Sequence, residues 1–221
     1  MAAGSVFLFS GPTAHGLPRE LFASPELHLC PPAVRGSISA IVEQTRPKGC
    51  IILVDGRFGD VMAVGHREIL DALDRGWEVW GLASIGAIRA AELSSYGMIG
   101  FGEVFRHFSD TAAPDDEVAV LHGPEPDYKP LTEALIDIRC FLRHLVRVGV
   151  LTDENAYDVA EQLSSRWFGD RTLPVIIETC REVAGSHAAE SAIYRAGEIP
   201  AHRLKSLDLH RFLQSREWAQ S

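Results

Sequence analysis

The run from Trp77 to Leu93, WEVWGLASIGAIRAAEL, constrains the fold of this chain more than any other stretch. It begins as a short apolar strand, VWGLA, and becomes a helix, AIRAAEL, at a junction marked by Ser84 and Gly86. A strand that feeds directly into a helix is typical of α/β proteins. Anions bind at such junctions, because free backbone N–H groups meet the positive end of the helix dipole there. The run therefore predicts an α/β fold with a functional site near Ser84.

Four short apolar runs have the pattern of strands that are buried on both faces. They are continuous rather than alternating, and turn residues follow each of them, over residues 6–9, 50–54, 78–81 and 118–121. Helical stretches separate them, which we expect over residues 38–45, 64–75 and 87–96. Strands that alternate with helices form a parallel sheet with right-handed crossovers. We therefore expect a small doubly wound, mostly parallel sheet in about the first 125 residues.

The remainder of the chain has helical rather than strand patterning. Apolar residues recur at helical spacing over residues 133–148, 153–168 and 173–184, and the last thirty residues also favour helix. We therefore divide the chain into an α/β core over residues 1–145 and a C-terminal helical extension over residues 146–221. The sequence leaves open whether the extension packs on the core or beside it.

The composition excludes partners that need a basic protein surface. The formal net charge is −9, which argues against binding to nucleic acid or to anionic membranes. The N-terminal segment has no basic region and its apolar run, VFLF, is only four residues long, so we expect neither a signal peptide nor a membrane span. The scattered cysteines are typical of reduced thiols in a cytoplasmic protein: Cys30, Cys50, Cys140 and Cys180.

Candidate catalytic residues gather where the predicted strands end. All strands of a parallel sheet open at one edge, so residues there meet whatever their sequence separation. The residues that end the predicted strands, or follow them in the loops, are Ser10, Asp55, Arg57, His66, Ser84 and His122. A serine, a histidine and an aspartate suffice for a nucleophile, a base and an orienting carboxylate. We expect Ser84, His66 and Asp55 in these roles, with His122 as the alternative base.

Each of these residues also has a purely structural interpretation. Ser84 stands where a serine commonly caps a helix N-terminus, and Leu82 replaces the glycine that a nucleophile elbow has two residues before its serine. Asp55 before a glycine can belong to a simple turn. His66 and His122 can be ordinary polar residues with satisfied hydrogen bonds. The residues alone do not decide between these interpretations.

Charged residues near the junction suggest an anion site. Arg89 and Glu92 lie three apart on one helical face and can form an ion pair, and Arg89 can also hold a carboxylate or thiocarboxylate. The acidic run 115–117 fits either oxygen ligands for a metal ion or a solvated turn, and we expect no metal site. The chain has neither a P-loop motif nor a dinucleotide-binding glycine motif, so we expect no nucleotide cofactor.

Six segments, taken together, resemble the TfuA-like family in order and spacing. They are PPAVRGS at 31–37, VDGRF at 54–58, GHREILDAL at 65–73, GLASIGAIRAAELSSYGM at 81–98, DDEVAVLHGP at 115–124 and YKPLTEALIDIR at 128–139. The resemblance covers roughly residues 5–140. Such proteins are typically encoded beside YcaO enzymes, which modify peptide backbones with ATP.

The resemblance implies an accessory role in YcaO-dependent backbone thioamidation during ribosomal peptide maturation. The implied reaction is hydrolysis of the C-terminal thiocarboxylate of a small ubiquitin-like sulfur carrier, which releases sulfide for YcaO. The ATP is used by YcaO, so no cofactor is expected on this chain. The alternative is a non-catalytic partner that binds YcaO and the sulfur carrier. A nucleotide-binding helper is a weaker third possibility, and a homo-oligomer is left open.

The resemblance also suggests how the anionic carrier tail binds. Residues expected to contact it are Gly86, Ala87, Arg89, Glu92, Ser10, Arg57 and Arg67. The chain departs from the family pattern at several positions. Arg67 replaces a common lysine, and arginine cannot act as a base because it stays charged. Ala83 replaces the first of two serines, Ile85 replaces a methionine, and Asp137 replaces an asparagine. Ser84 is then the remaining candidate nucleophile in this motif.

Overall fold

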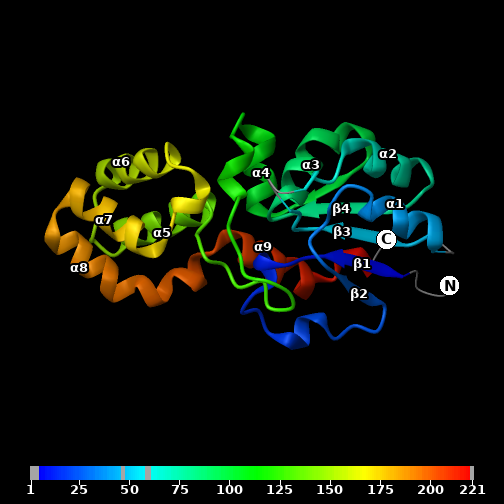
Figure 1. The fold of residues 1–221 in the computed structure, drawn as a ribbon, viewed down its shortest axis with the longest axis horizontal. Helices are drawn as coiled ribbons and strands as arrows, with labels where there is room; N and C mark the ends of the chain where they lie inside the picture. The colour runs from blue at the N-terminus through cyan, green and yellow to red at the C-terminus, as the bar shows by residue number, and fades with distance from the viewer. Residues whose placement is uncertain (1–4, 46–47, 58–60, 220–221) are drawn as a thin grey trace. The chain divides into compact units, whose positions relative to one another are not determined.

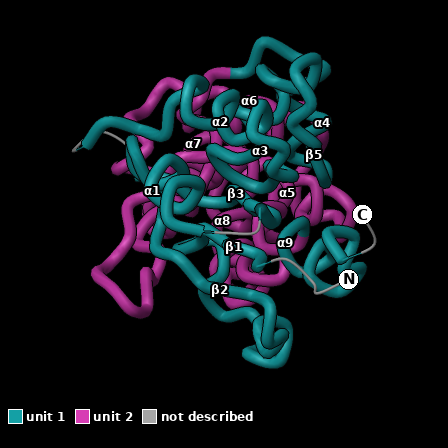
Figure 2. The backbone as a smooth tube through the Cα atoms, turned by 90° about the vertical axis from the view of Figure 1, so that its right-hand side faces the viewer, with its two compact units in different colours: residues 1–113, 208–221 teal, residues 114–207 magenta. Residues whose placement is uncertain are grey.

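The chain forms two compact units. The structure, a computed structural model, describes residues 5–45, 48–57 and 61–219. Residues 1–113 and 208–221 make up the first unit, and residues 114–207 make up the second (Figure 2). This division differs from the expected boundary at residue 145, which falls inside a helix of the second unit. The segment after residue 113 packs with that helix instead of adding a strand to the sheet.

The first unit contains a five-stranded, all-parallel sheet with the strand order β2-β1-β3-β4-β5. The strands are β1 Val6–Phe9, β2 Leu27–Cys30, β3 Cys50–Leu53, β4 Glu78–Leu82 and β5 Ile99–Phe101. Helices on both faces connect or cover them: α1 Ser37–Gln44, α2 His66–Asp74, α3 Ile85–Leu93, α4 Gly102–Asp110 and α9 Leu204–Ser215. The predicted doubly wound parallel fold is therefore confirmed.

Both faces of the sheet are buried, which explains the continuous apolar strands. Phe9, Leu53 and Val79 belong to the core that the sheet shares with α1, α2 and α3. Alternate strand residues belong to a second core, in which Trp80 packs against Phe212 of α9 with ring centroids 5.2 Å apart. Figure 1 shows α1, α2 and α3 on one side of the strands and α9 on the other.

One predicted strand was wrong and two strands were missed. Residues 118–121 form no strand, because Asp115–Val118 is a 3₁₀ helix (η4) that buries Val118 and packs against α5. β2 and β5 were missed because both are edge strands, without a continuous apolar run. Leu29 of β2 is 59% exposed, and β5 has only three residues, one of them a glycine.

The second unit is helical and has its own core. Its longer helices are α5 Leu135–Arg147, α6 Asp153–Ser164, α7 Leu173–Ala184 and α8 Ser186–Arg195, with 3₁₀ turns η5 Phe168–Asp170 and η6 Ala196–His202. Leu142, Leu163 and Cys180 are among the residues buried between them. The C-terminal helical extension is confirmed. In the described part of the chain, no helix has the length and apolar character needed to cross a membrane.

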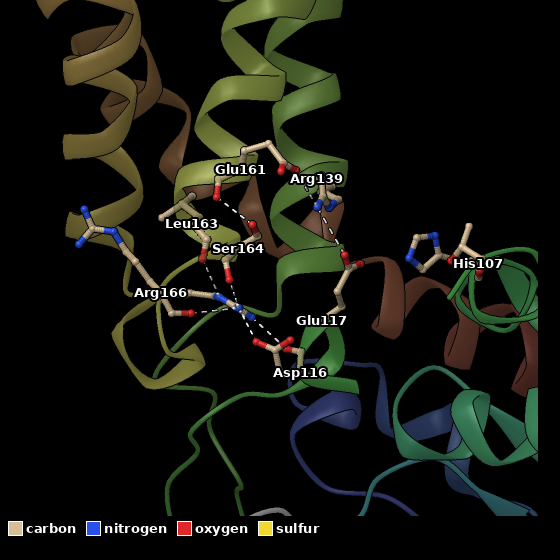
Figure 3. A network of polar contacts seen from close by, with 10 residues as sticks. His107, Asp116, Glu117, Arg139, Glu161, Leu163, Ser164 and Arg166 are labelled. Carbon is tan, nitrogen blue, oxygen red and sulfur yellow. Dashed lines mark hydrogen bonds and ion pairs between the residues drawn. The ribbon is translucent and has the colours of Figure 1, made fainter. Parts of the chain in front are cut away.

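Two carboxylates of the acidic run 115–117 pair with arginines (Figure 3). Asp116 Oδ2 accepts a hydrogen bond from Arg171 at 2.6 Å, and Arg171 is fully buried. Arg139 donates to Glu117 at 3.4 Å and to Glu161 at 3.5 Å. The Arg171 guanidinium also donates to the backbone carbonyls of Asp116, Leu163, Ser164 and Arg166. These contacts therefore hold the start of the second unit against α5 and α6.

Candidate functional site

The carboxyl edge between β1 and β3 is where a sheet of this strand order binds ligands, because the winding direction reverses there. Phe9 and Leu53 pair in register at the ends of these strands, and Leu53 pairs in turn with Gly81 of β4. The residues that follow these three neighbouring strands are Ser10, Asp55 and Ser84. The structure therefore brings these three candidates to one edge.

Asp55 is bound by the loop after β1 rather than by a histidine. Its Oδ2 accepts the N–H groups of Gly11 at 2.8 Å and Thr13 at 3.0 Å, and its Oδ1 accepts the Thr13 hydroxyl at 2.7 Å. The residue is 1% exposed. It makes no hydrogen bond to His66. Its carboxylate thus fixes the loop at the reversal point and does not orient the expected base.

Ser84 follows a strained turn. Ala83 has a φ of 65°, a left-handed conformation that costs a non-glycine residue about 1–3 kcal/mol. Across it, the Ser84 N–H donates to the Leu82 carbonyl at 2.7 Å. Ser84 occupies the N-cap position of α3, but its hydroxyl makes no capping hydrogen bond to the described helix backbone. The side chain of Ser84 therefore does not perform the structural role that competes with nucleophilic catalysis.

The first amides of α3 are mostly used within the fold. The Gly86 N–H donates to the Val54 carbonyl at 3.2 Å, and the Ala87 N–H donates to the Ser84 carbonyl at 2.9 Å. A Cβ on Gly86 would lie 1.8 Å from a carbonyl oxygen of β3, so glycine is needed for the close approach of α3 to the sheet. For the Ile85 N–H, no backbone acceptor outside α3 is found among the described residues. It is the amide best able to bind an anion beside Ser84.

His66 is paired with α3 further along that helix. Its Nε2 lies 2.7 Å from Glu92 Oε2, and the same oxygen accepts a hydrogen bond from Arg89 Nη1 at 2.6 Å. Arg89 Nε donates to the Val64 carbonyl at 3.2 Å. Burial raises the pKa of Glu92, but the hydrogen bonds from His66 and Arg89 outweigh burial and leave it lowered. The expected Arg89–Glu92 ion pair is confirmed, and His66 extends it.

The remaining candidates differ in their burial and in their place in the fold. Ser10 is partly buried, whereas Arg57 and Arg67 are exposed. His122 belongs to the second unit and forms an isolated antiparallel bridge with Pro130. Because no strand of the sheet precedes His122, the strand-end rule no longer places it at the carboxyl edge.

The sequence did not single out two buried polar residues that organise this edge. Thr13 holds Asp55, as described above. Glu68, which is 7% exposed, accepts the N–H groups of Gly36, Ile38 and Gly65 at 2.9–3.2 Å. It ties the start of α1 to the start of α2. A glutamate at the third position of a helix is a known capping signal, so Glu68 could have been recognised.

One protein family matches the chain. Its model, described as TfuA-like protein, matches residues 55–172, just over half of the chain. The matched range begins at Asp55 and includes Ser84, His66 and His122. None of the curated proteins compared with the chain matches it.

Proposed function

Because the chain belongs to the TfuA-like family, we propose that it supplies sulfide for YcaO-dependent peptide thioamidation. Family membership supports a role in a YcaO-associated system. In the proposed reaction, the chain hydrolyses the C-terminal thiocarboxylate of a small ubiquitin-like sulfur carrier. YcaO then uses the sulfide on an amide that it has activated with ATP, so this chain needs no cofactor.

The single observation that carries this proposal is the Ser84 hydroxyl at the junction of β4 and α3. It follows a left-handed Ala83 and makes no capping hydrogen bond to α3. Hydrolases place a serine nucleophile at a similarly strained turn between a strand and a helix. In this chain the strained residue is Ala83, and the serine is the next one. Strain at such a turn supports a functional role for the residue it positions.

The proposed reaction has two balanced steps. The Ser84 oxygen attacks the carbonyl carbon of the thiocarboxylate, the C–S bond breaks, and the hydroxyl proton leaves with sulfur as HS⁻. Water then attacks the resulting ester and the bond to the Ser84 oxygen breaks. One proton of the water returns to Ser84, the other is released to solvent, and the carrier is left with an ordinary carboxylate. In the first step the anionic leaving group takes up the proton itself. A base bonded to Ser84 is therefore not required for that step, which agrees with the absence of a Ser84–His66 hydrogen bond.

The helix start favours the negative charge of this substrate. The Ile85 N–H and the positive end of α3 lie next to Ser84, and a donor aimed at a developing oxyanion typically lowers the barrier by about 3 kcal/mol. Only part of the Arg89 guanidinium can bind a substrate, because Nη1 donates to Glu92 and Nε donates to the Val64 carbonyl. We assign Arg89 to attraction of the carrier tail rather than to the reacting oxygen.

The proposal is tested with purified chain and the carrier thiocarboxylate in the absence of YcaO and ATP. Sulfide and carrier carboxylate should appear in equal amounts and with multiple turnovers. A chain that binds the carrier but releases no sulfide would disprove hydrolysis.

The burial of Ser84 favours a second candidate function. Ser84 is only 3% exposed, and Asp55 is fully engaged by the loop after β1. Both facts suit a non-catalytic partner that binds the carrier tail and YcaO and positions the tail for the YcaO reaction. In that case sulfide should appear only when YcaO, ATP and the precursor peptide are all present.

A further inference from the structure

A cluster of two histidines and a glutamate lies in the second unit and shares no residue with the candidate site. His144 comes from α5, and Glu198 and His202 come from η6. Each residue offers one nitrogen or oxygen atom, and these atoms lie within 4.8 Å of one another. His144 Nε2 is 2.7 Å from Glu198 Oε2, and the rings of His144 and His202 stack with centroids 4.1 Å apart. The donor atoms of the three side chains thus lie close together.

The cluster is held by the core of its unit. Phe141, one helical turn before His144, packs against both imidazoles, with centroids 6.4 Å and 6.1 Å away. Ile199, beside Glu198, is buried in the same core. The side chain of His144 is 13% exposed, whereas that of Glu198 is 40% exposed. The donor atoms are therefore anchored on one side and reachable from solvent on the other.

We propose that His144, Glu198 and His202 form a binding site for a divalent transition-metal ion of the Zn²⁺ type. Two imidazole nitrogens and one carboxylate oxygen are donors that such ions prefer, and three protein ligands leave a fourth position for water. Ligands at zinc–ligand distances of about 2.0–2.2 Å stand roughly 3.4 Å apart in a tetrahedral site. His144 and Glu198 need only separate slightly from their present hydrogen bond. The ion would then replace the proton between them.

Two arginines compete with the ion. Arg147 Nη2 lies 3.4 Å from His144 Nδ1, and Arg195 Nη1 lies 3.2 Å from Glu198 Oε1. A guanidinium can only donate, so Arg147 favours the tautomer whose proton is on Nε2. Metal binding through Nε2 needs the opposite tautomer. Arg147 must therefore turn away when the ion binds, and its removal should tighten binding.

The test is a titration of the full, untagged chain with Zn²⁺ against a chromogenic chelator, with Co²⁺ absorption as a second readout. We expect one equivalent to bind, with proton release and a raised midpoint of thermal unfolding. His144→Ala and His202→Ala should each weaken binding by more than the roughly 10- to 100-fold that loss of an outer-shell partner costs. His187→Ala, at an exposed position of α8, is the matched control and should bind as the wild type does.

Arg147→Leu, at the exposed last residue of α5, should gain rather than lose affinity. We expect about tenfold tighter Zn²⁺ binding, within the range for changes beside a ligand. The proposal is overturned if the wild-type chain binds neither ion. It is also overturned if binding persists in both His144→Ala and His202→Ala, which would locate the ion elsewhere.

Discussion

The Nε2 atom of His66 lies 2.7 Å from Oε2 of Glu92, on the helix that begins just after Ser84. Glu92 is eight residues beyond Ser84, about 12 Å along the helix axis. The expected histidine base therefore has its carboxylate partner on α3 and not at Asp55. This arrangement separates the residues that the sequence grouped as one triad.

His66→Ala should lower the turnover number for sulfide release by less than about tenfold. Removal of a general base usually costs about 10²- to 10⁴-fold, but His66 makes no hydrogen bond to Ser84. Initial rates at saturating carrier thiocarboxylate measure the effect, and Glu92→Gln should give a similarly small change. A decrease of a hundredfold or more in the turnover number of His66→Ala would show that His66 is the catalytic base.

Asp55→Asn should destabilise the chain by about 1.5–3 kcal/mol or more, because charge-assisted hydrogen bonds to Gly11 and Thr13 are lost in a buried site. Urea unfolding measures this change. Asp71→Asn, at an exposed position of α2, is the matched control and should change stability little. At temperatures where Asp55→Asn stays folded, sulfide release should persist. If the folded variant released no sulfide, Asp55 would have a catalytic role.

Gly86→Ala should destabilise the chain by about 3 kcal/mol or more, because the added methyl group would lie 1.8 Å from the Leu53 carbonyl oxygen. In an unobstructed helix the same change would stabilise by roughly 0.5–1 kcal/mol. Gly65→Ala is the control, since a Cβ there has open space around it. Thermal unfolding compares the two, and equal midpoints would contradict the close packing of α3 on β3.

Asp137→Asn should change the pH dependence of stability. Burial raises the pKa of Asp137 to about 6, although Lys205 acts in the opposite direction. Between the unfolded value of about 3.9 and 6, the folded state holds the proton more tightly. The contribution of Asp137 to stability is therefore present at low pH and lost as pH rises.

Asp137→Asn does not lose this contribution, so its stability relative to wild type should rise by about 2 kcal/mol between pH 4 and pH 7. Denaturant unfolding at several pH values measures the difference. A constant difference across that range would show that Asp137 does not titrate there.

The sequence predicted the centre of the sheet better than its edges. β1, β3 and β4 are buried on both faces, so their apolar runs are continuous and visible. β2 and β5 lack that signal because solvent reaches them. The run at 118–121 resembles a strand because Val118 and Ala119 are buried, and burial alone does not reveal whether the partner is a strand or a helix.

The candidate site was predictable only in outline. The sequence predicted that Ser10, Asp55 and Ser84 lie together, because the carboxyl ends of neighbouring parallel strands lie at the same edge of the sheet. The partner of each side chain did not follow: Thr13 reaches Asp55 from a 3₁₀ turn 42 residues away, and His66 meets Glu92 across 26 residues. Such pairings depend on loop geometry that has no periodic signature in the sequence.

The most direct test of the account is the rate of sulfide release by Ser84→Ala compared with Ser94→Ala. Ser94 is an exposed serine immediately after α3, so it controls for loss of a hydroxyl near the same helix. The account predicts that Ser84→Ala folds, binds the carrier and loses at least about a hundredfold in rate, whereas Ser94→Ala keeps wild-type activity. Wild-type sulfide release by a folded Ser84→Ala would contradict it.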